Sequence, residues 1–195
     1  MINNEKVYIA LLHFPVYNKE GAVVASSITN LDLHDLARLT MSYGLKRYYV
    51  LEPLELQARL AQRLMSHWLT GPGADANWTR QVAFQHVKLI SELGEAREEI
   101  EKETGVAPRL VATTARKMKK QLSFEKLREK MAAQKDQCWL ILFGTGWGLT
   151  EEFMESECDY ILEPILAGAF YNHLSVRTAA AIIIDRLLAI DRKND

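Results

Sequence analysis

The stretch Cys138-Trp139-Leu140-Ile141-Leu142-Phe143, followed directly by Gly144-Thr145-Gly146-Trp147-Gly148-Leu149, decides the fold. An unbroken apolar run of this kind predicts a strand buried on both faces, as in a parallel sheet covered by helices. The run Val7–Leu12 has the same character. We predict further strands at 47–51, around 84–90, at 110–113 and at 160–162.

Helical spacing of apolar residues fills the intervals between these strands. Gly44 and Gly105 are placed to end two of the helices. The expected helices cover residues 30 or 32 to 43, 53–68, 91–104, 123–134, a short segment from 150, and 174–190. The segment Thr70–Asp75 is predicted to be a turn within the domain. This alternation favours an α/β fold with a mostly parallel sheet flanked by helices, in a single domain spanning residues 1–195.

Composition narrows the class of protein. The chain has 195 residues, 48% of them hydrophobic, and a formal net charge of −1, so its bulk charge does not indicate nucleic-acid binding. Its start lacks the basic residues and apolar stretch of a signal peptide, and no apolar run approaches the roughly 20 residues of a membrane span. Cys138 and Cys158 lack metal-ligand spacing. We therefore expect a cytoplasmic protein with reduced thiols, no membrane segment and no metal.

Two segments could hold a ligand. Glycine alternates with other residues from Gly144 to Gly148, after the most apolar strand, and lets the backbone approach a ligand closely. The loop lacks the Gly-Lys-Ser/Thr of a P-loop and the last glycine of a dinucleotide fingerprint, which Leu149 replaces. The second segment is Leu162–Ile165 with the Ala-rich helix start after Asn172. A tight structural turn and a Ser-capped core helix are the respective alternatives.

Together the two segments form an ordered signature: Phe-Gly-x-x-x-Gly-Leu, then Leu-x-Pro-Ile, then Asn-x-Leu-Ser-Val-x-x-Ala-Ala-Ala-Ile. This signature resembles that of the SPOUT class of RNA methyltransferases. Near the N-terminus, Asp32, Arg38 and Tyr43-Gly44 resemble the family motif Asn-x5-Arg-x4-Phe-Gly. The whole length looks most similar to a small bacterial group related to tRNA (guanine-N1) methyltransferase.

The resemblance implies a C-terminal trefoil knot over about residues 109–190 that binds S-adenosylmethionine through backbone groups of three loops. It also implies an RNA substrate, tRNA or rRNA. Carried onto this sequence, the cofactor-binding residues are Thr113, Thr114, Gly144, Thr145, Gly146, Trp147, Gly148, Leu149, Ile161, Leu162, Ile165, Leu174, Ser175 and Val176.

Arg38 is the first candidate for a catalytic residue, because the matching family arginines approach the target nucleotide; a surface ion pair or a helix-solubilising role is the alternative. Asp32 and His34 flank the same helix start, and either could be a base, with capping and surface roles as alternatives. Asp32 stands where many relatives have Asn, and Gly146 stands where several ribose-methylating relatives have Glu. These two departures leave the methylated atom open. Trp147 could line the pocket, stack on a base or pack in the core, while His13 and His173 are expected to be structural.

Three functions from different classes fit these observations. The first is an RNA methyltransferase; the second is a knotted protein that binds S-adenosylmethionine or RNA without activity; the third is an unrelated α/β hydrolase or nucleotide-binding protein. A basic segment from Arg116 to Lys130 could contact RNA or be an ordinary solvated surface. The last helix is apolar around most of its circumference, which predicts a homodimer. The resemblance implies the same arrangement, with each site completed by residues such as Arg38 of the partner.

Overall fold

The computed structural model describes residues 2–166, 168 and 172–189 of the chain. Its centre is a seven-stranded sheet in which every pair of neighbouring strands is parallel, in the order β5-β4-β1-β8-β6-β9-β7. The strands are β1 (Val7–Leu12), β4 (Arg47–Leu51), β5 (Val87–Ile90), β6 (Arg109–Ala112), β7 (Gln121–Leu122), β8 (Trp139–Gly144) and β9 (Tyr160–Leu162).

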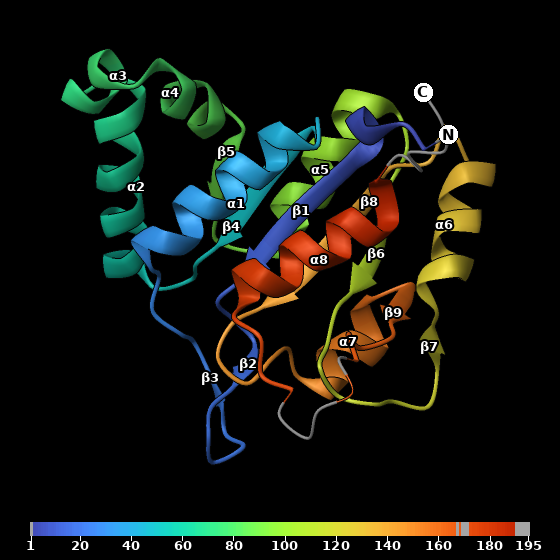
Figure 1. Cartoon of the computed structure of the whole chain (residues 1–195). Coiled ribbons are helices and arrows are strands. Elements are labelled where there is room, and N and C mark those ends of the chain that lie inside the picture. The colour runs from blue at the N-terminus through green and yellow to red at the C-terminus, as the bar shows by residue number, and fades with distance from the viewer. Residues whose placement is uncertain (1, 167, 169–171, 190–195) are drawn as a thin grey trace.

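Helices cover both faces of this sheet, as Figure 1 shows. The described helices are α1 (Asn30–Ser42), α2 (Glu55–Leu69), α3 (Pro72–Ala76), α4 (Trp78–Gln85), α5 (Leu93–Thr104), α6 (Phe124–Ala133), α7 (Glu151–Glu157) and α8 (Val176–Leu188), with a 3-10 turn at Asn4–Lys6. α1, α8 and α6 lie on one face, and α5 and α7 on the other. No described helix is long and apolar enough to cross a membrane.

The apolar runs are buried on both sides, as predicted. Along β1, Val7, Ile9 and Leu11 pack into the core under α1 and α8, while Tyr8, Ala10 and Leu12 pack under α5 and α7. This alternation follows from the two-residue period of a strand. The parallel sheet with helices on both faces is therefore confirmed.

Short polar residues cap the starts of three helices, and a glycine ends a fourth, as predicted for Gly105. Ser123, Thr150 and Ser175 each accept a hydrogen bond from a backbone N–H in the first turn of α6, α7 and α8. Gly105 ends α5 with a φ of 74°, a conformation that costs glycine little. At α1 the cap is Thr29, so the helix begins at Asn30, the earlier of its two predicted starts.

Between residues 70 and 90 one prediction was wrong and a second was correct only in part. The expected turn at Thr70–Asp75 contains helix α3, and Phe84 belongs to helix α4, so the strand β5 begins only at Val87. Phe84 is buried against the ring of Trp68 at a centroid distance of 6.5 Å. This helix-to-helix contact decides the secondary structure here, over the β propensity of the segment.

A small antiparallel hairpin was not predicted. β2 (Val16–Tyr17) pairs with β3 (Val23–Val24) in the long connection between β1 and α1. The hairpin lies beyond the carboxyl end of β1, next to the glycine loop that follows β8 (Figure 1). Val16 forms a bridge with Leu149, so the hairpin is held against that loop.

Candidate cofactor site

A cavity of about 1030 Å³ opens at the carboxyl edge of the sheet. Its walls are the segments that follow four neighbouring strands, β1, β8, β6 and β9, together with the start of α8. Ligands of open α/β sheets bind at this edge, because the loops there converge on one space. Most of the positions that the sequence indicated for the cofactor line the cavity, together with several residues of the connection between β1 and α1.

The glycine loop after β8 forms one side of this cavity and has a strained course that only glycine tolerates well. Gly146 has a φ of 55° and Gly148 a φ of 90°, both in the left-handed region. A Cβ on Gly144 would lie 2.6 Å from the backbone nitrogen of Leu149, because the loop folds back on itself there. The loop is therefore a tight structural turn that also borders the cavity.

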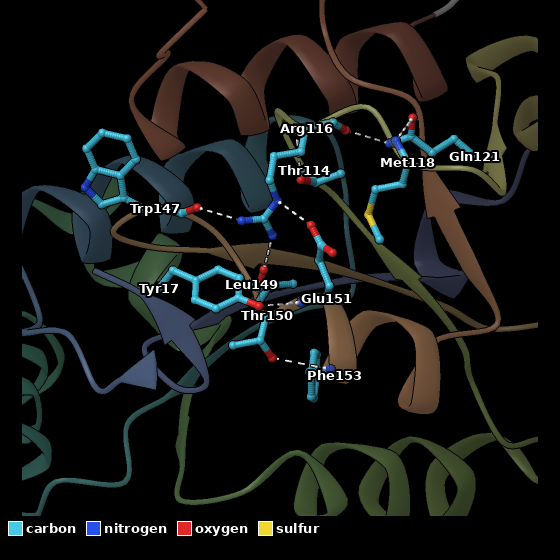
Figure 2. A network of polar contacts seen from close by, with 10 residues as sticks. All are labelled: Tyr17, Thr114, Arg116, Met118, Gln121, Trp147, Leu149, Thr150, Glu151 and Phe153. Carbon is cyan, nitrogen blue, oxygen red and sulfur yellow. Dashed lines mark hydrogen bonds and ion pairs between the residues drawn. The ribbon is translucent and has the colours of Figure 1, made fainter. Parts of the chain in front are cut away.

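Arg116 holds the far end of the glycine loop (Figure 2). Its guanidinium donates one hydrogen bond to the carbonyl of Trp147 at 3.3 Å and another to the carbonyl of Leu149. Nε lies 3.7 Å from a carboxylate oxygen of Glu151, and the guanidinium carbon lies 5.0 Å from the centre of the Tyr17 ring. Arg116 is half-buried and directed inward, so the basic segment loses its first member as a surface cation.

The connection between β1 and α1 supplies a wall that sequence reasoning missed. Tyr17, Ser26, Ser27 and Thr29 line the cavity. The carbonyl of Tyr17 accepts a hydrogen bond from the Trp147 N–H at 3.0 Å, which joins the hairpin to the glycine loop. The available signal was the mostly polar run Ser26-Ser27-Ile28-Thr29, which lies directly before helix α1.

Asp32 lies at the cavity and is almost fully buried. One carboxylate oxygen accepts a hydrogen bond from the Thr29 hydroxyl at 2.6 Å, and the other lies 3.3 Å from Nε of Arg177. Arg177 also reaches Asp35 at 3.4 Å, so α8 is joined to α1 by ion pairs beside the cavity. The carboxylate of Asp32 is thereby fixed in position with a cation at its side.

Arg38 lies elsewhere. Its side chain is exposed on α1, and it does not line the cavity of its own chain. It follows Asp32 by six residues, which corresponds to about 9 Å along a helix axis. His34, the other residue at this helix start, packs its ring against those of Trp68 and Phe84 and also lies outside the cavity.

The residues predicted to hold the cofactor mostly surround this cavity. All of them line it except Leu149, Ile161 and Leu162. Leu149 is buried beneath the loop, and the other two are core residues of β9. Trp147 is half-exposed at the cavity wall, with its ring at 5.4 Å from that of His173 in an edge-on contact.

The cavity fits a nucleoside-like cofactor. Its volume stands at the upper end of the range of about 300–1,000 Å³ for ligand pockets, which leaves room for part of a substrate beside the cofactor. Apolar side chains, among them Phe143, Ile165 and Ile183, form one part of the wall. Residues of the glycine loop, together with Ser26 and Ser175, form another. An adenine ring with its ribose needs this combination of an apolar slot and short polar groups. No group of three or more metal-ligating side chains occurs among residues 2–166, 168 and 172–189.

These features define an α/β protein with a cofactor cavity at the carboxyl edge of a parallel sheet. A family model described as "SAM-dependent RNA methyltransferase" matches residues 6–189. The chain therefore belongs to the family of S-adenosylmethionine-dependent RNA methyltransferases, and its cofactor is S-adenosylmethionine. The resemblance noted in the sequence is confirmed.

Relatives agree with this assignment. An uncharacterized protein of Aquifex aeolicus is 44% identical over 189 residues, which is 97% of this chain and 91% of the relative. A tRNA (guanine-N(1)-)-methyltransferase of Oleidesulfovibrio alaskensis is 46% identical over 182 residues, or 93% of this chain but only 42% of that protein. The chain thus spans less than half of this methyltransferase.

Solved structures confirm the fold. The SpoU methyltransferase AviRb from Streptomyces viridochromogenes, solved in complex with AdoMet, has a TM-score of 0.57 and 14% sequence identity. The match covers 96% of this chain and 58% of AviRb. At this sequence identity the structural similarity shows only that the fold is shared, and the family assignment rests on the sequence.

Proposed function

We propose that this chain methylates a nucleotide of a tRNA in the cytoplasm, at the cavity beside the glycine loop. The class of reaction, methyl transfer to RNA, follows from membership of the RNA methyltransferase family. The preference for tRNA is supported by the tRNA (guanine-N(1)-)-methyltransferase relatives. More than half of each of those proteins lies outside the match, so the experiment below asks directly whether the matched part acts on tRNA.

In this proposal the loops after β6, β8 and β9 hold the cofactor, in the trefoil-knot arrangement expected for residues 109–190. The bound cofactor supplies an electrophilic methyl group, and in-line positioning of the nucleotide accounts for much of the acceleration. Asp32 is the residue best placed to accept a proton from the target atom or to hold its N–H. Its contacts with Thr29 and Arg177 fix one geometry of the carboxylate.

The RNA would approach over the loop after β6. Thr113, Thr114, Ala115 and Arg116 line the cavity, and the exposed residues that follow include Lys117, Lys119 and Lys120. Exposed lysines attract phosphate groups without reading sequence, and with a net charge of −1 the attraction would come from a local cationic surface and not from the bulk charge.

We also propose a homodimer. The last helix, α8, leaves less apolar surface for a partner than the sequence suggested. α8 buries Ala180, Ile183, Ile184, Leu187 and Leu188 in its own subunit, between α1 and α6. Ile190 lies outside the described residues. What supports the dimer is the place of Arg38, exposed and away from the cavity of its own chain, together with exposed Leu31 on the same helix. A partner subunit could bring Arg38 to the cavity.

The decisive experiment has two stages. Calorimetry with S-adenosylmethionine tests the cavity, and transfer of labelled methyl groups to total RNA, followed by mapping of modified nucleotides in a deletion strain, tests the substrate. Binding with transfer to tRNA is the expected result. Binding without transfer would mean a binding protein, and label confined to rRNA would overturn the tRNA assignment.

Arg38→Ala should abolish methyl transfer and leave cofactor affinity and thermal stability unchanged, since the side chain is exposed and outside the cavity. When Arg38→Ala is co-refolded with Gly146→Val, mixed dimers with one intact composite site should recover part of the activity. Retention of more than about half of the wild-type rate in Arg38→Ala would remove this residue from the site. A mass near the monomer value of 22.2 kDa by light scattering would exclude the dimer.

A further inference from the structure

A fully buried histidine, His13, lies directly after β1 and does not line the cavity. Its Nδ1 is 2.9 Å from Oγ of Ser26, which in turn is 2.5 Å from Oγ1 of Thr145. Thr145 Oγ1 is 3.2 Å from the carbonyl oxygen of Leu12. These contacts form a chain of hydrogen bonds from the core, through the hairpin segment, to the first half of the glycine loop.

The direction of this chain is determined by its last member. A carbonyl oxygen only accepts, so the single hydroxyl proton of Thr145 goes to Leu12. Thr145 must then accept from the Ser26 hydroxyl, whose own proton is used in that bond. Nδ1 of His13 therefore carries a proton and donates it to Ser26. This assignment identifies the tautomer from the neighbours alone.

The same direction argues against His13 as the base of the reaction. A proton passing from the cavity through Ser26 would reach a nitrogen that already holds one. Burial lowers the pKa of His13, which the charge of Asp32 opposes, and burial raises the pKa of Glu52, whose Oε2 lies 4.0 Å from Nδ1. A charged imidazole is thus disfavoured at this place.

We propose that His13 is a positioning residue of the methyl-transfer site, which acts through Ser26 to hold Thr145 and so the glycine loop in its cofactor-binding shape. The loop needs such support because Gly146 and Gly148, which have left-handed backbones here, can also adopt other backbone conformations. Arg116 holds the far end at Trp147 and Leu149, and the chain from His13 holds the near end. The proposal rests on the proposed function in that the loop binds S-adenosylmethionine.

The test compares two substitutions that both remove the imidazole. His13→Asn can still place an amide N–H near the position of Nδ1, whereas His13→Leu cannot. We expect His13→Leu to weaken affinity for S-adenosylmethionine about fivefold, the effect of one lost hydrogen bond, and His13→Asn to stay within about twofold. The KM for the cofactor should rise with little change in kcat or in its pH profile. Glu52→Gln is the control, since it changes a carboxyl group near His13 and leaves the hydrogen bonds from His13 through Ser26 to Thr145 intact.

A second readout uses the protein without cofactor. Backbone hydrogen exchange at Thr145, Trp147 and Gly148, whose N–H groups are bonded to Leu12, Tyr17 and Thr145, should be faster in His13→Leu than in His13→Asn. If neither exchange nor affinity separates the two variants, His13 is only a core residue. If wild-type protein fails to bind the cofactor, the proposed function fails, while exchange still decides whether His13 holds the loop.

Should both His13 variants fold poorly, the hydroxyl links give the same test. Ser26→Ala and Thr145→Val should each accelerate exchange in the loop and weaken cofactor affinity. The double variant should lose no more cofactor affinity than the single variant with the larger loss, because the same series of hydrogen bonds is broken in every case. Additive losses would mean that the two hydroxyls contact the cofactor independently, and that result would overturn the positioning role.

Discussion

Two glycine-rich segments of this chain look alike in sequence and differ in structure. Gly71-Pro72-Gly73 and Gly144-Thr145-Gly146-Trp147-Gly148 were both expected to be loops. The first begins helix α3, and neither of its glycines has a positive φ. The second remains a loop with left-handed backbones at Gly146 and Gly148 and borders the cavity.

The physical use of glycine differs between them. A Cβ on Gly73 would lie 2.7 Å from the ring of Trp68 and 2.8 Å from that of His67, so the missing side chain allows α3 to pack against α2. Around Gly148 nothing lies within 4 Å of a Cβ, and there the residue serves the backbone conformation. Glycine density therefore indicates a ligand site only at the carboxyl edge of the sheet, where open space and backbone freedom coincide.

Gly146→Val should have the largest effect on cofactor binding. The new Cβ would lie 2.9 Å from the carbonyl oxygen of Tyr17, and a β-branched residue is strained at a φ of 55°. We expect affinity for S-adenosylmethionine to fall at least about tenfold, or about 1.4 kcal/mol, in calorimetry. Gly105→Val is the matched control, with a φ of 74° and open space far from the cavity. Equal losses in both variants would attribute the effect to strain alone.

Trp147→Ala tests a second difference between the two glycine-rich segments. Trp147 lies within the second segment and Trp78 lies shortly after the first, and both side chains are exposed. Only Trp147 lines the cavity, where it can stack on an unpaired base. We expect RNA affinity to fall about fivefold in Trp147→Ala, from the loss of about 1 kcal/mol of stacking, and to stay unchanged in Trp78→Ala. Equal RNA affinity of both variants in filter binding would exclude the stacking role.

Gly73→Ala should leave cofactor affinity within error and lower thermal stability instead. Trp68 cannot move aside easily, because it packs against the rings of His34 and Phe84 and under the guanidinium of Arg80. The cost of such overpacking is about 1–3 kcal/mol, which exceeds the gain of about 1 kcal/mol in helix propensity. Calorimetric unfolding measures the change, and an unchanged Tm would show that α3 yields without strain.

Much of the fold was readable from single segments of sequence. Some features depend on neighbouring residues only. They are the apolar runs of β1 and β8, the helix caps at Ser123, Thr150 and Ser175, and the end of α5 at Gly105. The segment from 70 to 86 was misread because its state is decided by contacts of Phe84 and Gly73 with helix α2. Propensity is too weak to predict such packing.

The sequence by itself determined the parallel α/β class, the family signature and the place of the glycine loop, because periodicity and the carboxyl-edge rule need no knowledge of distant partners. Only the tertiary structure decided what holds that loop. Ser26 and Thr145 are 119 positions apart, and Arg116 reaches Leu149 across 33. A hydroxyl or a guanidinium has many partners available in an unfolded chain, and the sheet order, which makes β1, β8 and β6 neighbours, selects the ones that meet.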